Sequence, residues 1–311
     1  MKNLIGDLKI DFMGKRKFAL ILSSALVLIA LAAIFARGLN LGVDFTGGYT
    51  IEVGYESAAN LDEVRSTLAA TGFEDAVVQT FGSNTDVLIR IAPSEELTGV
   101  ELSTKVVSAL TNASAEKVEM RRVEFVGPQV GEELRETGGL AVLAALFAIV
   151  LYIWVRFEKK FSVGSVLALV HDVIITLGIF ALFQIEFDLT ILAALLAVIG
   201  YSLNDTIVVF DRIRENFLEM RRGSPSEIIN VSVNQTLSRT IITSLTTLLV
   251  LLALFFLGGK IINGFALALI IGVVVGTYSS IFVASTAVLQ LGITKEDLMP
   301  VEKEGVDFEE G

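Results

Sequence analysis

Six long apolar runs dominate the chain, at residues 18–36, 138–155, 162–183, 189–210, 240–257 and 263–287. A helix needs roughly 18 to 20 consecutive apolar residues to cross the hydrocarbon core of a bilayer. The pattern therefore predicts a polytopic α-helical membrane protein with six transmembrane helices. The first run follows Lys15, Arg16 and Lys17, as a signal peptide would. Because its roughly 19 residues exceed the usual 7 to 15 of a signal core, we interpret it as a retained anchor.

The long stretch between the first two runs has a different pattern. Apolar and polar residues alternate at 49–53, 76–81, 86–91 and 117–125, which predicts strands, and apolar residues three or four apart predict helices over 61–70 and 99–110. The order β-α-β-β-α-β is that of the ferredoxin-like fold. The sequence thus predicts one small α+β domain, which is either a binding module or a passive cap on the membrane part.

Basic residues set the predicted orientation. Five precede the first run, three lie between the second and third runs, and five lie between the fourth and fifth, whereas the opposite short loops hold only Lys260. Cytoplasmic loops are enriched in Lys and Arg, so both termini are expected in the cytoplasm and the α+β domain is expected to be exported. The predicted divisions are a cytoplasmic tail (1–17), the first helix (18–36), the exported domain (37–137), a five-helix bundle (138–290) and an acidic cytoplasmic tail (291–311).

The amino-acid composition argues against several classes of function. The chain has a net charge of −11, no cysteine and one histidine. The negative charge argues against nucleic acid as a partner. The absence of cysteine excludes disulfides and thiolate sites, and a single histidine excludes a multi-histidine metal centre. No phosphate-binding P-loop occurs in the sequence. We therefore expect no enzyme activity, no bound metal and no cofactor.

Charged residues inside the apolar runs are the candidate functional groups. An ionised side chain at the bilayer centre costs at least ~2.5 kcal/mol unless it is paired or hydrated. His171 and Asp172 fall within the third run and Asp205 within the fourth, while Arg239 opens the fifth. These four residues are the predicted proton-coupling groups. The predicted polar support is Asn204 and Gln235.

The connection between the fourth and fifth runs brings two of these groups to a similar height. Ser224, Pro225 and Glu227 form a capping-box signature, so the helical hairpin turns near Ser224. Asp205 lies 19 residues before that turn and Arg239 lies 15 after it. At 1.5 Å per residue their heights differ by about 6 Å. They are able to form a static bridge or to exchange partners, and the sequence leaves both options open.

Three further sets of residues carry weaker signals. His171 is adjacent to Asp172, but consecutive helix positions point about 100° apart, so a proton relay and a packing histidine both remain open. Small residues in the last run indicate close helix packing. They are Gly272, Gly276 and Ser280. The glycines that flank the exported domain indicate hinges or ordinary turns. They are Gly42, Gly47, Gly48, Gly127 and Gly131.

The combined motifs resemble those of the SecF family of bacterial protein-export subunits, which is related to the resistance-nodulation-division transporters. The resemblance covers nearly the whole chain. It is carried by GLNLGVDFTGG, FVGPQVGEEL, VHD, GYSLNDTIVVFDRIREN, NQTLSRTIITSLTTL and GVVVGTYSSIFVA.

The resemblance implies a multi-pass protein of the bacterial inner membrane that pairs with SecD as half of a twelve-helix unit. Such a pair associates with the SecYEG channel and helps to pull a preprotein outward after the SecA motor has acted, at the expense of the proton-motive force. It also implies that Asp205 and Arg239 lie at the interface with SecD, whose own aspartate carries protons. Two alternatives are a proton-coupled small-molecule exporter subunit and a scaffold subunit without ion transport.

Overall fold

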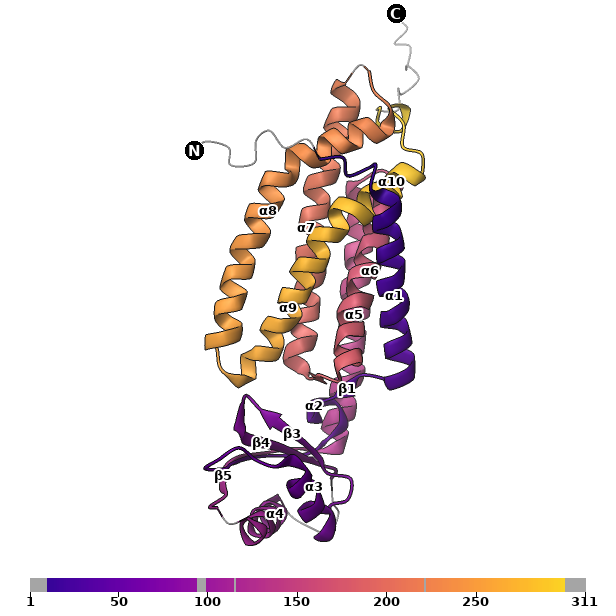
Figure 1. Cartoon of the computed structure of the whole chain (residues 1–311). Coiled ribbons are helices and arrows are strands. Elements are labelled where there is room, and N and C mark those ends of the chain that lie inside the picture. Colours follow the sequence, from indigo (N-terminus) through magenta and orange to yellow (C-terminus); the bar gives the residue numbers. More distant parts are fainter. Residues whose placement is uncertain (1–9, 94–98, 115, 221, 300–311) are drawn as a thin grey trace, which may run out of the picture.

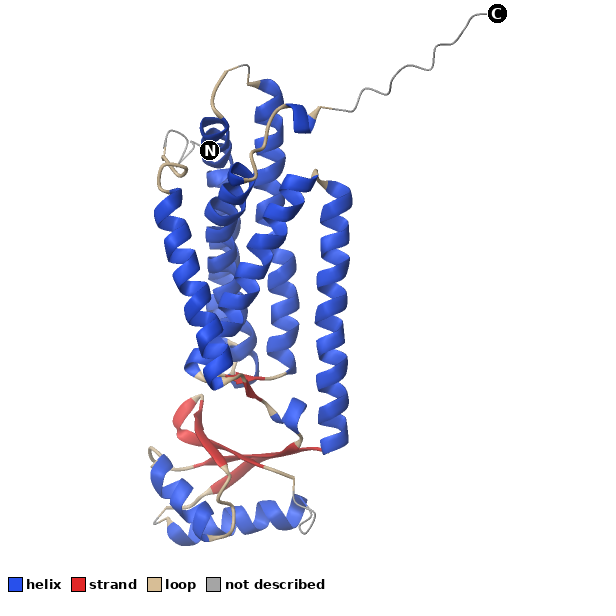
Figure 2. Cartoon of the chain, turned by 90° about the vertical axis from the view of Figure 1, so that its right-hand side faces the viewer, coloured by secondary structure: helices blue, strands red, loops and turns tan. Residues whose placement is uncertain are grey.

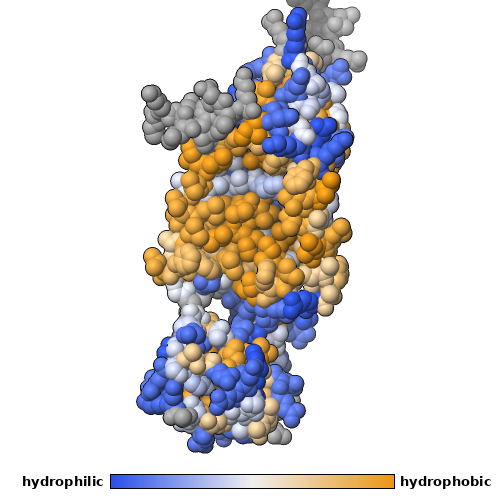
Figure 3. All heavy atoms as spheres, in the orientation of Figure 1, coloured by the Kyte–Doolittle hydropathy of each residue, from blue (hydrophilic) through white to orange (hydrophobic). Residues whose placement is uncertain are grey.

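The computed structural model describes residues 10–93, 99–114, 116–220 and 222–299. Most of the predicted N-terminal tail and most of the predicted acidic C-terminal tail lie outside these ranges. Within them, six helices are long and apolar enough to cross a membrane. On the face that Figure 3 shows, a hydrophobic band covers the helical part, with hydrophilic surface above and below it.

The membrane part is a bundle of long helices (Figure 1). Its members are α1 (Arg16–Arg37), α5 (Pro128–Arg156), α6 (Lys159–Phe183), α7 (Leu189–Glu219), α8 (Pro225–Leu257) and α9 (Lys260–Ser279). The last helix continues through a π-helical turn, η1 (Ser280–Ala284), into α10 (Ser285–Gln290), and a short 3₁₀ turn, η2 (Glu296–Leu298), follows. We call the end of the bundle beside the α+β domain the domain end, and the opposite end the distal end.

The α7–α8 hairpin extends well beyond the apolar runs that predict it, at the distal end. Its turn has the predicted capping box, because Ser224 Oγ accepts from Glu227 N and the Glu227 carboxylate accepts from Ser224 N at 2.7 Å. Asn216 Nδ2 donates to Ser232 Oγ at 2.8 Å and joins the two helices below the turn. These contacts connect the two helices beyond the predicted apolar runs.

The α+β domain has the element order that the sequence predicts: β2 (Gly48–Gly54), α3 (Leu61–Ala70), β3 (Val77–Phe81), β4 (Ser83–Ile91), α4 (Gly99–Ala113) and β5 (Glu119–Val126). Its antiparallel sheet has the strand order β3-β4-β2-β5. Tyr49, Ile51 and Val53 of β2 enter the core beneath the two helices. Alternation turns Thr50 and Glu52 to the opposite, helix-free face. Figure 2 shows that this face is turned toward the bundle.

A short parallel pairing joins the domain to the bundle. Strand β1 (Asn40–Leu41) follows α1 and pairs with β6 (Glu186–Phe187), which lies in the α6–α7 connection. The short helix α2 (Val43–Thr46) comes next, and then Gly47 and Gly48 adopt φ of 69° and 127°, which favour glycine. The segment between α1 and the α+β domain is thus attached to the bundle through the pairing of β1 with β6.

Candidate functional site

Asp172 is the most completely buried of the candidate residues, with no exposed surface. It lies on α6, and its Oδ2 accepts hydrogen bonds from Ser202 of α7 at 2.5 Å and from Ser279 of α9 at 2.6 Å. Three helices therefore converge on one carboxylate. Burial of a carboxylate is tolerated where hydroxyl donors satisfy its oxygens, so this geometry explains how an aspartate is held deep inside an apolar bundle.

His171 contacts Asp172 directly, since its Nδ1 lies 2.8 Å from Asp172 Oδ1. The expectation that the two side chains point apart is wrong at this position, because both bend into the space between α6 and the last helix. The His171 ring stacks on Tyr278 with a centroid distance of 6.3 Å. Its buried Nε2 has no hydrogen-bond partner among the described residues. Tyr278 in turn donates to Ala19 O of α1 at 2.8 Å.

Asp205 forms a second buried centre, 3% exposed, on α7. Ser244 of α8 donates to its Oδ2 at 3.4 Å, and Ser244 Oγ lies 2.7 Å from Thr277 Oγ1 of α9. Asp205 thus has a hydroxyl partner at the α8–α9 contact. Like Asp172, it accepts a hydrogen bond from a hydroxyl and forms no ion pair with a Lys or Arg among the described residues.

Arg239 does not pair with Asp205 in this structure. It is exposed on α8, and within the described ranges its side chain forms no ion pair or hydrogen bond. Its neighbours Ile242 and Leu245 are 55% and 53% exposed, so Arg239 borders an apolar surface of the bundle. A similar height in the hairpin has therefore not brought the two charges into contact, because Arg239 lies on the outer side of α8.

The two carboxylate centres share α7 and α9. Ser202 lies three residues before Asp205, and Thr277 lies two before Ser279. A close approach of the helices makes this sharing possible: a Cβ on Gly272 would lie 2.2 Å from Val198 Cγ2, and one on Gly276 would lie 3.1 Å from Ser202 Cβ. The small-residue stripe thus lies at the α7–α9 contact, while Ser280 is fully buried at the start of the π-helical turn.

The predicted polar support residues lie elsewhere. Asn204 is exposed on α7. Gln235 Oε1 accepts from Arg212 Nε at 2.6 Å and from Asn216 Nδ2 at 2.7 Å, at the distal end. The sequence did not single out Ser244, Thr277, Ser279 or Tyr278. Hydroxyl residues occur on every face of a membrane helix, so only the helix packing selects these four.

The flanking glycines have different roles. Gly47 and Gly48 need their positive φ, whereas Gly42 and Gly127 have φ of −69° and −63°, which other residues adopt. Gly131 lies inside α5, where an added Cβ would lie 2.7 Å from Gly47 N. Its small size therefore permits close packing of α5 on the chain reversal that begins the domain.

A charged network holds the domain to the bundle. Arg90 of β4 donates to Asn40 Oδ1 at 2.8 Å and Leu41 O at 2.9 Å, and it lies 3.5 Å from the Glu186 carboxylate. Gln79 Nε2 also donates to Glu186, at 2.9 Å. Burial raises the pKa of Glu186 above its ordinary value, and this effect exceeds the opposing effects of Arg90 and Gln79. The described residues include no group of three or more His, Asp or Glu positioned to hold a metal.

Comparisons with known proteins show the class of protein to which this chain belongs. The family described as "Protein export membrane protein SecD/SecF, C-terminal" matches residues 105–294, and the SecD/SecF GG motif matches residues 32–59. The chain is thus a protein-export membrane protein of the SecD/SecF class. The SecF translocase subunit of Vibrio alginolyticus is 55% identical over 97% of this chain and 96% of its own length. The Escherichia coli O157:H7 subunit is 49% identical over 96% and 93%. The chain belongs to the SecF family of protein translocase subunits.

Two solved structures extend the likeness to the fold. The crystal structure of SecDF from Thermus thermophilus matches with a TM-score of 0.84 and 40% identity, over 92% of this chain. The chain spans 39% of that longer protein. A second SecDF structure, in a super-membrane-facing form, matches with a TM-score of 0.68 over the same share.

Proposed function

We propose that this chain pairs with SecD and couples proton movement to preprotein export through the SecYEG channel, after the ATP-driven step of SecA. The observation that carries the proposal is the position of Arg239, which borders an apolar surface and forms no ion pair among the described residues. A cation in a membrane span needs a counter-charge. Because the family resemblance implies an intramembrane aspartate in SecD, that aspartate is the partner we assign to Arg239.

The two buried carboxylates complete the proposed machinery. Asp205 and Asp172 sit on helices that share contacts, so a change at one is transmitted through α7 and α9 to the other. Moving one charge across 100 mV corresponds to about 2.3 kcal/mol, which is enough to bias a conformational cycle. We propose protons as the coupling ion, with no other cofactor and no enzymatic step in this chain.

Our proposed topology places the distal end in the bacterial cytoplasm and the ferredoxin-like domain outside the inner membrane. The basic residues that support this orientation include Arg156 and Arg214, near the distal ends of α5 and α7. In this arrangement the helix-free face of the sheet faces the outer surface of the inner membrane.

The substitution Arg239→Met tests the proposal. It removes the charge offered to SecD, so we expect proton-dependent export to fall at least tenfold while SecD still copurifies. Arg239→Lys keeps the charge and should retain a substantial part of the activity. If Arg239→Met exports preprotein normally at wild-type protein level, the mechanism is wrong; if it only weakens the complex, the scaffold alternative is favoured.

A further inference from the structure

The segment before α1 is clipped to α8 by two asparagines one helical turn apart. Asn230 Oδ1 accepts hydrogen bonds from Phe12 N at 2.8 Å and Met13 N at 3.1 Å, and Asn234 Oδ1 accepts from Ile10 N at 2.9 Å. Both asparagine amides also donate to Ile10 O. We call residues 10–14 the strap. It crosses the distal end of the bundle in Figure 1.

The strap is inserted into the bundle and is not merely laid on it. Phe12 is 6% exposed and Met13 is 1% exposed. The Phe12 ring meets Phe282 edge-on at 5.6 Å, and Phe282 meets Tyr278 at 5.3 Å. Because Tyr278 stacks on His171, a continuous line of aromatic contacts joins the strap to the Asp172 centre.

Two unpaired hydroxyls lie nearer the distal end of the bundle than the Asp172 centre does. Ser165 is seven residues from Asp172 on α6, and Thr286 is seven residues from Ser279 along the last helix, each about 10 Å toward the distal end. Both residues are fully buried, and neither hydroxyl has a hydrogen-bond partner among the described residues. Buried unpaired hydroxyls are costly, so these positions gain stability when water reaches them.

The π-helical turn Ser280–Ala284 separates Ser279 from Thr286 and carries Phe282. Such turns are frequent at functional sites and provide a place where a helix changes register. A shift in this turn would move Phe282 away from Phe12 and change the position of Ser279 at Asp172. One element therefore connects the strap with the carboxylate.

We propose that Ser165 and Thr286 line a water route from Asp172 to the distal surface, and that the strap is its gate. With the strap bound, Phe12 and Met13 would close the route, and release of the strap from Asn230 and Asn234 would open it. This inference deepens the proposed function, because it supplies the distal half of a proton path for Asp172.

The absence of cysteine in the sequence allows a direct test. A Thr286→Cys reporter is placed in the full-length chain in inverted membrane vesicles and treated with a water-soluble maleimide. Adding Asn230→Ala and Asn234→Ala should raise the labelling rate at least tenfold. Asn263→Ala is the matched control: its amide also donates to a backbone carbonyl, Phe255 O at 2.9 Å, but at the domain end, so the rate should stay unchanged.

A second variant tests the gate independently, in case the double asparagine variant does not fold. Phe12→Ala leaves both asparagines in place but removes the aromatic closure, and it too should raise labelling of the Thr286→Cys reporter. Unchanged slow labelling in either correctly inserted variant would overturn the gate. The labelling rate reports water access and not export, so this outcome is distinguishable from a failure of the Arg239 experiment.

Discussion

At the residue scale, the choice of partners for the buried carboxylates is the main finding. Asp172 receives two hydroxyl hydrogen bonds and Asp205 receives one, and neither forms an ion pair with Lys or Arg among the described residues. Hydroxyl groups satisfy the oxygen atoms without neutralising a charge. The two carboxylates therefore remain able to respond to a proton or to a cation brought by a partner chain. A static bridge to Arg239 would have fixed the Asp205 charge.

The sequence predicts the charged members of the site but not their surroundings. Asp172, Asp205 and Arg239 stand out because charge is rare within apolar runs. Their helical spacing does not determine which face is buried, so the outward position of Arg239 and the contact between His171 and Asp172 depend on tertiary packing. The contacts of Arg90 with Asn40, Leu41 and Glu186 could not be predicted from the sequence either, because these residues are far apart in the chain.

Glu186 makes a testable contribution to stability outside the membrane. Burial raises its pKa in the folded state, so the folded protein binds the proton more tightly than the unfolded chain does. Its contribution is fully present below the ordinary value of 4.5 and is lost as pH rises through the raised pKa. We expect the wild-type unfolding midpoint to fall more steeply with rising pH over this window than that of Glu186→Gln. Parallel pH profiles in thermal unfolding experiments would contradict this assignment.

At the scale of elements, the α7–α9 contact organises both carboxylate centres. The two helices supply Ser202, Asp205, Thr277 and Ser279 from facing surfaces. Small residues on α9 keep these surfaces close, and no larger side chain fits without displacement of α7. The small residues Gly272 and Gly276 are a weak signal in the sequence alone. They matter for the geometry of the site because they permit this close contact.

The substitution Gly272→Ala tests this contact. Its added methyl group would collide with Val198, and we expect overpacking to cost about 1–3 kcal/mol of unfolding free energy. Gly139→Ala on α5 is the control, because an added Cβ there meets no atom within 4 Å. The control should be neutral or stabilising by up to about 1 kcal/mol, as helical glycine is replaced by alanine. Equal unfolding midpoints for the two variants would show that α7 tolerates displacement.

Long periodic elements were predictable and short ones were not. The apolar runs gave six membrane helices, and alternation gave the strands near 49–53 and 86–91. Strands β1 and β6 have two residues each, too few for a periodic signal, and they pair only because the α6–α7 connection meets the end of α1. The π-helical turn likewise depends on packing around Ser280, and its sequence reads as ordinary helix.

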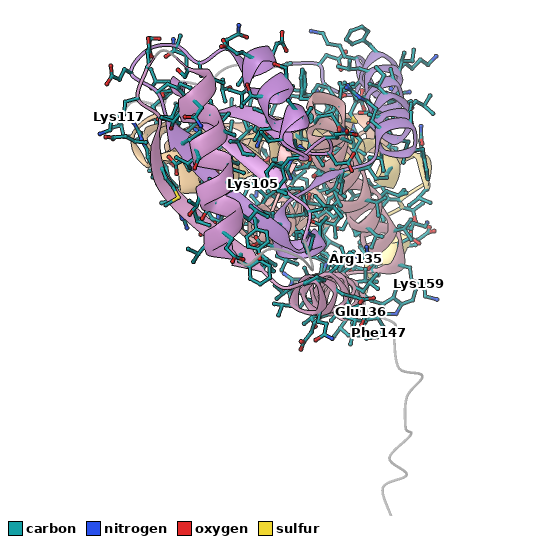
Figure 4. All side chains as sticks on the ribbon, turned by 90° about the horizontal axis from the view of Figure 1, so that it is seen from below. Lys105, Lys117, Arg135, Glu136, Phe147 and Lys159 are labelled. Carbon is teal, nitrogen blue, oxygen red and sulfur yellow. The ribbon has the colours of Figure 1, made fainter. Side chains whose placement is uncertain are left out.

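At the scale of the whole molecule, two surfaces of the described part of the chain are open to the outside. A cleft of about 810 Å³ separates the helix-free face of the sheet from the domain end of the bundle, with Glu52 and Phe255 among its lining residues. Helix α5 stands at the rim of the bundle and directs Phe147 outward, as Figure 4 shows from the domain end. Phe147 is 71% exposed, which fits contact with lipid or with a second membrane protein.

We propose that an intramembrane carboxylate of this chain couples protons to export. The most direct measurement is the movement of a partly translocated preprotein in membrane vesicles, with and without an imposed proton gradient, for Asp205→Asn and for Asp211→Asn. Asp211 lies on the same helix but pairs with Arg156 at the surface. We predict that Asp205→Asn loses the gradient-dependent component while Asp211→Asn keeps it. A full response to the gradient in Asp205→Asn, with the complex assembled, would contradict the account.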